Sequence, residues 1–311
     1  ADTARAFKQY DNKDGSFMVF YSDLADAKPE DHLQIVWKDA EDQELSTQKF
    51  VVDYSGVTLG ANDEQALIML LEGGKSAILT EDIEIGGADQ ASGRKEHLIT
   101  IPENQTVMLD LNGHTLTAYI NYSTTTNSKN QTVIDSRYFV IKNNGSLTLK
   151  DSQGSGKITM ASDNGMIGNF GKLQVESGEY ENTLPCLTAI IENDSDMTMT
   201  GGLLTGGVGI AAYGSDSVTK MTGGKIDAQY HGISSNGTIK EGVQIYAGYT
   251  VTIGGAAEIV SDDTGLYMPA DGTVNIEGNA AITSTGAELK NGEAYAAAVG
   301  IDLRVGTLNI T

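Results

Sequence analysis

The hydrophobic positions of this chain recur as a short phrase: two apolar residues separated by one residue, a turn of small residues, then another apolar position. The second apolar residues of successive copies are Leu149, Val175, Met199, Met221, Ile253, Ile276 and Ile310, spaced by 26, 24, 22, 32, 23 and 34 residues. Strands this short cannot bury enough surface alone, so each copy must stack on the next. The shorter spacings fit one coil of a three-strand solenoid, and the longer ones predict loops inserted at the corners.

This pattern predicts an all-β chain whose residues 61–311 form a right-handed parallel β-helix of about eight coils. The segment Asp63–Leu71 is predicted to be a short capping helix, opened by Asn62 and closed by Gly73 and Gly74. The Ser-, Thr- and Asn-rich segment Tyr119–Tyr138 is interpreted as an insertion. Asn-Gly and Asp-Gly pairs are expected to supply turns with positive φ; they begin at Asn144, Asn164, Asn236, Asp271 and Asn291.

Residues 1–60 lack the repeat and are predicted to form a small β subdomain or an extended N-terminal cap. Three apolar segments, Phe17–Tyr21, Leu33–Trp37 and Phe50–Val52, are expected to be its strands. At the other end, the chain stops within a copy of the repeat, which favours a truncated solenoid from a longer protein.

One segment resembles a known family. The run Val107–Thr117, VMLDLNGHTLT, is similar to a phrase of the pectin-lyase-like β-helix modules found in large surface proteins of gut anaerobic bacteria. The resemblance implies the β-helix fold over residues 62–311, and an extracellular place on the bacterial surface. It does not identify an activity, because members include lyases, hydrolases, adhesins and stalks. His114, within this phrase, is interpreted as a hydrogen-bonded turn residue.

Composition limits the classes of molecule that the chain is expected to bind. The 311 residues carry a formal net charge of −22, which repels nucleic acids and anionic lipids, and disfavours acidic polysaccharides unless a cation bridges them. The longest apolar run, Ala66–Leu71, is too short to span a bilayer, so membrane insertion is not expected. The single cysteine, Cys186, lies between apolar neighbours and is interpreted as a buried apolar residue.

Catalytic motifs of the family are incomplete. Its hydrolases carry Asn-x-Asp, Asp-Asp, Gly-His-Gly and Arg-x-Lys in that order, whereas here Asp262-Asp263 follows His231-Gly232, Tyr230 replaces the first glycine, and Arg-x-Lys is absent. The Arg-x-Pro-x-x-Arg pattern of the calcium-dependent lyases is also absent. No cofactor is predicted, although calcium at acidic corners such as Asp194–Asp196 or Asp262-Asp263 stays open.

A Gly-apolar phrase, as in Gly209-Ile210, indicates which strand residues face outward. If the residue after each glycine points inward, alternation turns Ile167, Ala211 and Ser234 outward. The same alternation makes a candidate ligand-binding face from Asn169, Tyr213, Asn236, Tyr267, Asp302 and Arg304. Its tyrosines are expected to stack on sugar rings while the polar residues bond hydroxyl groups.

These observations favour a non-catalytic adhesion or ligand-binding module of a larger surface or secreted protein, expected to be monomeric. Its expected partner is a host or dietary glycan, or a host surface protein that would use the same tyrosines and arginine. Two alternatives remain: a polysaccharide lyase or glycoside hydrolase whose acids come from separate coils, and a passive stalk.

Overall fold

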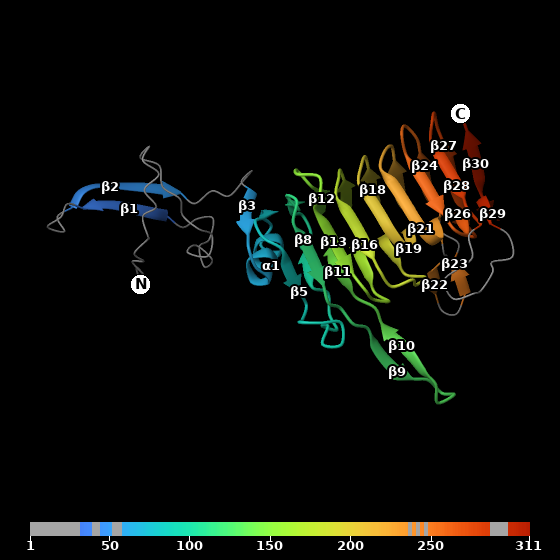
Figure 1. Cartoon of the computed structure of the whole chain (residues 1–311), viewed down its shortest axis with the longest axis horizontal. Helices are drawn as coiled ribbons and strands as arrows, with labels where there is room; N and C mark the ends of the chain where they lie inside the picture. Colours follow the sequence, from blue (N-terminus) through green and yellow to red (C-terminus); the bar gives the residue numbers. More distant parts are fainter. Residues whose placement is uncertain are drawn as a thin grey trace.

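The computed structural model describes residues 32–38, 44–51, 58–235, 238–240, 243–245, 248–286 and 298–311. Most of this chain is β-strand, arranged as long parallel sheets in a solenoid-like stack (Figure 1). The architecture is compatible with the predicted parallel β-helix.

A ten-stranded parallel sheet forms one side of the stack. In spatial order its strands are β3 (Thr58–Ala61), β4 (Ser76–Leu79), β7 (Thr106–Asp110), β12 (Ser146–Lys150), β15 (Lys172–Val175), β18 (Asp196–Met199), β20 (Val218–Met221), β24 (Tyr249–Ile253), β27 (Gly272–Ile276) and β30 (Thr307–Ile310). Leu149 pairs with Val175, and the same register continues through Met199, Met221, Ile253 and Ile276 to Ile310. The repeat read from the sequence is therefore confirmed residue by residue in this sheet.

A fourteen-stranded parallel sheet supplies the remaining strands and has two arms. The first arm contains β5 (Ile83–Ile85), β8 (Thr115–Ala118), β13 (Lys157–Met160), β16 (Glu179–Asn182), β25 (Glu258–Ser261) and β28 (Ala281–Ser284). The second arm contains β6 (Ile99–Ile101), β11 (Phe139–Asn143), β14 (Gly165–Asn169), β17 (Ala189–Asn193), β26 (Thr264–Met268) and β29 (Val299–Leu303). Two ten-residue strands, β19 (Leu203–Ala212) and β21 (Lys225–Ser234), belong to both arms.

The core lies between the sheets. Its second-arm contribution is one row of aliphatic residues in register from coil to coil: Ile99, Ile141, Ile167, Ile191, Ile210, Ile233, Leu266 and Ile301. All but the last are buried, and Ile301 packs against the same cluster. Stacking identical aliphatic positions removes apolar surface from water along the whole solenoid, which stabilises coils that would be unstable singly.

The predicted helix is α1 (Glu64–Glu72), and it ends at Gly73 as expected. The predicted N-cap is wrong by one residue. Asp63, not Asn62, caps the helix, because its carboxylate accepts a hydrogen bond from the Ala66 N–H at 2.7 Å. Leu67, Leu70 and Leu71 are buried, so the helix packs its apolar side on the first strands of the solenoid.

The phrase that resembles the β-helix family, Val107–Thr117, covers most of β7, the start of β8 and the tight turn between them. Asn112 and Gly113 both have positive φ, 49° and 81°, and the His114 N–H donates to the Leu111 carbonyl at 2.8 Å. The prediction that His114 is a hydrogen-bonded turn residue is confirmed.

The glycines predicted to need positive φ behave differently. Gly145, Gly165 and Gly272 are not among the positive-φ residues. They are required by close approach instead: a Cβ at Gly165 would lie 2.6 Å from the Phe139 ring, and one at Gly272 would lie 2.6 Å from the Tyr249 ring. The pairs at Asn236 and Asn291 lie outside the described residues.

Within the described ranges, three antiparallel hairpins accompany the solenoid. The first pairs β1 (His32–Lys38) with β2 (Glu44–Val51), which confirms strands at Leu33–Trp37 and Phe50–Val51; the predicted strand Phe17–Tyr21 lies outside the described residues. The predicted insertion contains β9 (Ser123–Thr126) paired with β10 (Thr132–Ser136), which projects from the stack beside β11 (Figure 1). The third pairs β22 (Thr238–Lys240) with β23 (Val243–Ile245).

Candidate functional site

The outer face of the second arm carries aromatic and charged side chains from several coils. Its strands pair in register, so one row of outward positions crosses the arm: Lys142, Gly168, Glu192, Ala211, Ser234, Tyr267 and Asp302. Each is next in sequence to a residue of the buried aliphatic row, and alternation therefore turns it outward. We call this set the outer row.

Asn169 does not belong to this face, so its predicted outward orientation is wrong. It is 0% exposed, as are Asn143 and Asn193, and the three form a ladder inside the stack. The Asn143 side-chain amide donates to the Asn169 side-chain oxygen at 2.7 Å, and Asn169 donates in turn to Asn193 at 2.7 Å. Buried amides of this kind are stable only when paired.

The error arose from register. The Gly-apolar phrase makes Gly165-Met166 a copy of Gly209-Ile210 and so aligns Met166 with Ile210. The strands instead align Ile167 with Ile191 and Ile191 with Ile210. A shift of one residue exchanges the two faces of a strand, so Ile167 is also buried and not outward. Ala211 and Ser234 do lie in the outer row, but neighbouring side chains cover both.

At one end of the face, three planar groups from successive strands form a stack. The His231 and Tyr267 rings are nearly parallel, with centroids 4.6 Å apart and an interplanar angle of 16°. The Arg304 guanidinium carbon lies 4.9 Å from the Tyr267 centroid. We call this group the His–Tyr–Arg stack. The predicted residues Tyr267, Asp302 and Arg304 are therefore brought together, while Asn236 lies outside the described residues.

Two carboxylates flank the stack. Asp302 accepts hydrogen bonds from the Arg304 Nε and Nη2 at 3.2 and 3.1 Å, which holds the guanidinium in place. The Asp263 carboxylate lies 3.8 Å from His231 Nδ1, beyond hydrogen-bond distance. His231 Nδ1 is buried and makes no hydrogen bond within the described part of the chain.

Burial shifts the pKa values of two groups at the stack, His231 and Asp263. It lowers the pKa of His231, so the imidazole is neutral near pH 7. Burial also raises the pKa of the Asp263 carboxyl, and the negative charge of Asp302 adds to this. In the sequence, His231 and Asp263 stood out only as parts of a hydrolase motif whose residues occur in the wrong order along the chain. The parallel pairing of β21 with β26 places them side by side.

Tyr213 occupies the middle of the face. It packs, half-buried, on a small outer cluster made of Ala189, Val208, Ala211 and Tyr230. This cluster is separate from the main core. The predicted face residue Tyr213 therefore lies on the outer side, two strands away from Tyr267.

The opposite end of the face holds a second aromatic group. The Phe139 ring lies over Gly165 and Gly168, and a Cβ at Gly168 would lie 2.5 Å from it. His97 stacks on Phe139 with centroids 5.5 Å apart, and Phe170 meets its edge at 6.0 Å. We call His97, Phe139 and Phe170 the aromatic platform. No sequence motif indicated it, because its members come from three different coils.

Phe170 is the exposed member of this platform. Its side chain is 42% exposed, and Lys142 Nζ lies 5.5 Å from its ring centroid. The Phe170 ring therefore remains accessible from solvent.

Two carboxyl groups, those of Glu192 and Asp194, lie between the aromatic platform and the outer cluster under Tyr213. Burial raises the pKa of Glu192 to about 7; the charge of Asp194 raises it further and that of Arg137 opposes this. Burial likewise raises the pKa of Asp194. Near neutral pH, Glu192 is therefore able both to donate and to accept a hydrogen bond.

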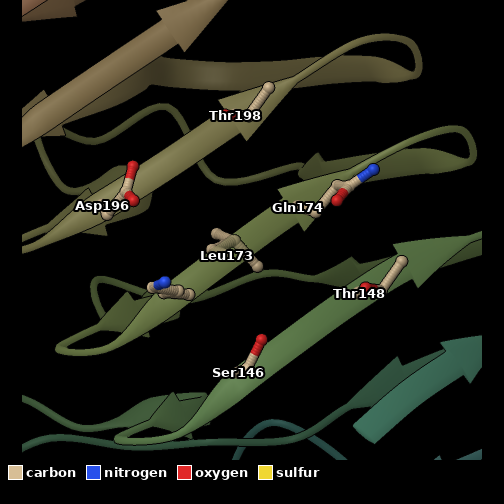
Figure 2. Close-up of a pocket in the computed structure, with 7 residues that line it drawn as sticks. Ser146, Thr148, Leu173, Gln174, Asp196 and Thr198 are labelled. Carbon is tan, nitrogen blue, oxygen red and sulfur yellow. The ribbon is translucent and has the colours of Figure 1, made fainter. Parts of the chain in front are cut away.

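A separate hollow lies on the outer side of the ten-stranded sheet. Side chains of β12, β15 and β18 line it, among them Ser146, Thr148, Gln174, Asp196 and Thr198 (Figure 2). Its volume of about 170 Å³ is below the range of small-molecule pockets.

Across the described residues, no three His, Cys, Asp or Glu side chains gather as metal ligands, at Asp262-Asp263 or elsewhere. Within the same ranges, no helix has the length and apolar character needed to cross a bilayer. Cys186 is free and buried, as expected from its neighbours.

The chain matches no family model, no curated protein and no solved structure.

Proposed function

We propose that the stack is a right-handed parallel β-helix of about eight coils, of the pectin-lyase-like type, with α1 as its N-terminal cap. Three observations support this. Each coil contributes one strand to the ten-stranded sheet and one segment to each arm of the other, with β19 and β21 each supplying both segments. The asparagine ladder connects three successive coils, and α1 packs against β3, β4, β5 and β6.

We further propose that the chain is a non-catalytic, extracellular ligand-binding module of a bacterial surface protein, and that its ligand is a glycan. The observation that carries this proposal is the His–Tyr–Arg stack with its two flanking carboxylates. A fixed guanidinium donor and carboxylate acceptors are the chemistry that sugar hydroxyls require, because hydroxyls form strong hydrogen bonds with charged groups.

The arrangement also indicates how a sugar would dock. Tyr267 lies on β26, between β21 with His231 and β29 followed by Arg304, so its neighbours cover its two flat faces. The ligand therefore meets the ring edge of Tyr267 and the outer side of Arg304, which is 56% exposed. Asp302 keeps the guanidinium plane fixed, which limits the entropy lost on binding.

Charge favours an uncharged glycan. The whole chain carries a net charge of −22, and Asp302 and Asp263 flank the stack, beside Arg304 and His231 respectively. An acidic sugar would be repelled by this field, whereas hydroxyl groups pair with carboxylates without a charge penalty. A host protein is the competing partner, and a monomer is the proposed state.

A glycan array followed by titration calorimetry tests the proposal. We expect binding to neutral oligosaccharides, and a loss of affinity of at least about tenfold in Arg304→Ala. Lys220→Ala, on the outer side of the ten-stranded sheet, removes an exposed cation from another surface and serves as the control. Absence of binding to every neutral glycan, or equal affinity of Arg304→Ala and Lys220→Ala, would refute the proposal. If host proteins also failed to bind, a passive stalk would be the remaining function.

A second candidate function, glycoside hydrolase or polysaccharide lyase, is favoured by one observation. Asp263, with a raised pKa, and Asp302, paired with Arg304, provide an acid and a charged carboxylate near one neutral imidazole. Release of reducing ends or unsaturated sugars from polysaccharides by the wild-type chain, lost in Asp263→Asn, would establish this function in place of simple binding.

A further inference from the structure

The hairpin of β9 and β10 is a two-stranded ribbon whose outer edges pair with no other strand in the described part of the chain. It projects away from the stack of coils (Figure 1). The unpaired N–H and C=O groups along such an edge form a template on which another strand can add. Regular geometry and uncharged residues keep an edge open to such pairing.

The two edges of this hairpin differ. The register of β10 shifts between Ile134 and Ser136, where an extra residue forms a bulge. Bulges twist a strand and disrupt edge pairing. By contrast, β9 pairs without a shift from Thr124 to Thr126, and its sequence contains no charged residue, proline or glycine. The β9 edge is therefore the open one.

Alternation identifies the backbone groups at the open edge. The Asn127 N–H donates to the Gln131 carbonyl at 3.0 Å, so it points across the hairpin. In an antiparallel pair, the N–H and C=O of every second residue point to the same side. Thr125 therefore bonds towards β10, whereas the N–H and C=O groups of Thr124 and Thr126 point away from it. A further strand would bind these outward groups.

Side-chain hydrogen bonds hold both ends of the hairpin. At the tip, the Asn127 side-chain oxygen accepts from the N–H groups of Lys129 and Gln131, at 2.9 and 3.0 Å. At the base, Ser123 Oγ lies 3.2 Å from the Tyr138 hydroxyl, within hydrogen-bond distance. A strand edge that is held in place before binding loses little conformational entropy when a partner adds to it.

The base of β9 lies beside exposed acidic side chains. The Asn121 side-chain amide, just before β9, donates to the Gln90 carbonyl at 2.8 Å, which attaches the base to the loop of residues 86–93. Asp89 in this loop is exposed, and so is Glu84, which accepts a hydrogen bond from the Tyr119 hydroxyl at 3.3 Å. A strand that adds to β9 would therefore meet negative charge at this end.

One face of the ribbon favours β-branched side chains. Thr125 pairs with Val133, whose side chain is 37% exposed. A residue of a third strand opposite Thr125 would extend this row on the same face. Cross-strand pairs of β-branched residues stabilise a sheet.

We propose that the β9 edge binds an extended peptide segment of a partner protein by strand addition, antiparallel to β9. The segment has β-branched residues at alternate positions and basic residues at its C-terminal end, which lies beside Asp89 and Glu84. The net charge of −22 on the whole chain attracts such a basic segment. This edge is separate from the face proposed to bind glycans, so the inference does not depend on that function.

The test uses a capped synthetic peptide, Thr-Val-Thr-Val-Lys-Lys, whose binding to the full chain is measured by fluorescence anisotropy. Thr124→Pro removes one outward N–H, and proline is tolerated in an edge strand where its nitrogen faces solvent. We expect Thr124→Pro to bind the peptide at least about tenfold more weakly than wild type. Thr124→Ala keeps the backbone N–H and is the matched control, expected to bind within about twofold of wild type.

Hydrogen exchange provides a readout that needs no variant. In the wild-type complex, exchange of the Thr124 and Thr126 amides should slow, because both N–H groups become bonded to the peptide. Unchanged exchange at these amides, equal affinity of wild type and Thr124→Pro, or absence of peptide binding would overturn the inference.

Two further measurements separate the features of the occupant. A peptide with glutamates in place of the lysines should bind at least about tenfold more weakly, and equal affinity for both peptides would overturn the basic character of the segment. Sedimentation of the chain alone tests for a second copy at the same edge. Self-association that is lost in Thr124→Pro would assign the β9 edge to a second copy and overturn the assignment to a partner peptide.

Discussion

The side-chain amide of Asn143 donates a hydrogen bond to the side-chain oxygen of Asn169 at 2.7 Å, with both residues fully buried. The same Asn169 amide group donates to Asn193 and to the Asp196 carbonyl, at 2.7 and 3.0 Å. Each asparagine thus connects its own coil to the next and satisfies a backbone carbonyl at the bend leading to the ten-stranded sheet. The ladder stabilises the bend from which Phe170, Asp194 and Tyr213 project.

We expect Asn169→Ala to lower the free energy of unfolding by about 2–4 kcal/mol, because it leaves buried partners on both neighbouring coils without hydrogen bonds. Urea denaturation monitored by circular dichroism measures the change. Asn275→Ala is the control: this asparagine bonds Thr252 and Asn309 on the outer side of the sheet, so its loss should cost under about 1 kcal/mol. Equal losses in the two variants would contradict a structural role for the buried ladder.

Gly168 lies under the Phe139 ring, so a side chain at this position should displace the aromatic platform. Gly168→Ala is expected to destabilise the fold by about 1–3 kcal/mol, since a Cβ would lie 2.5 Å from ring atoms. Thermal unfolding measures this. Gly248→Ala, whose Cβ would have only Asp216 nearby, at 3.8 Å, should change stability little. An unchanged Tm in Gly168→Ala would show that Phe139 moves freely.

Glu192 should make stability fall as pH rises. Its pKa is about 7 in the folded chain against 4.5 as a free side chain, so the folded state holds a proton that the unfolded state has lost. The free energy of unfolding therefore decreases between about pH 4.5 and 7, by at most about 3 kcal/mol. Glu192→Gln should remove this slope, and Glu103→Gln, at an exposed position, should retain it. Chemical denaturation across this pH range is the measurement; identical slopes in all three proteins would disprove the assignment.

Arg304→Lys separates charge from shape in the His–Tyr–Arg stack. Lysine keeps the positive charge but lacks the planar fork that bonds Asp302 through two nitrogens. We expect glycan affinity to fall roughly three- to tenfold, and stability to change by less than about 0.5 kcal/mol, because the side chain is exposed. Titration calorimetry with the tightest-binding glycan of the array measures the change in affinity. Full affinity in Arg304→Lys would mean that only charge matters at this position.

Much of the fold is readable in the linear pattern. The apolar pairs ending at Leu149, Val175 and their successors predicted the register of the ten-stranded sheet, because a residue buried in every coil must recur once per coil. The helix and the hydrogen-bonded turn at His114 were also predicted, since local hydrogen bonding determines them, and so was the inserted segment. The positive φ angles of Asn112 and Gly113 were not predicted.

The site depended on relationships that no local pattern contains. The sequence predicted Tyr213, Tyr267, Asp302 and Arg304 as face residues, but misassigned Asn169, because a one-residue shift in one coil exchanges inside and outside.

The sequence by itself determined that short strands stack in a periodic solenoid, because periodic burial is a property of the chain. Only the tertiary structure decided that His231 stacks on Tyr267 and that Phe139 covers Gly168. These partners lie in different coils, and the register in which the parallel strands pair, which no local pattern contains, sets which side chains become neighbours across the sheet.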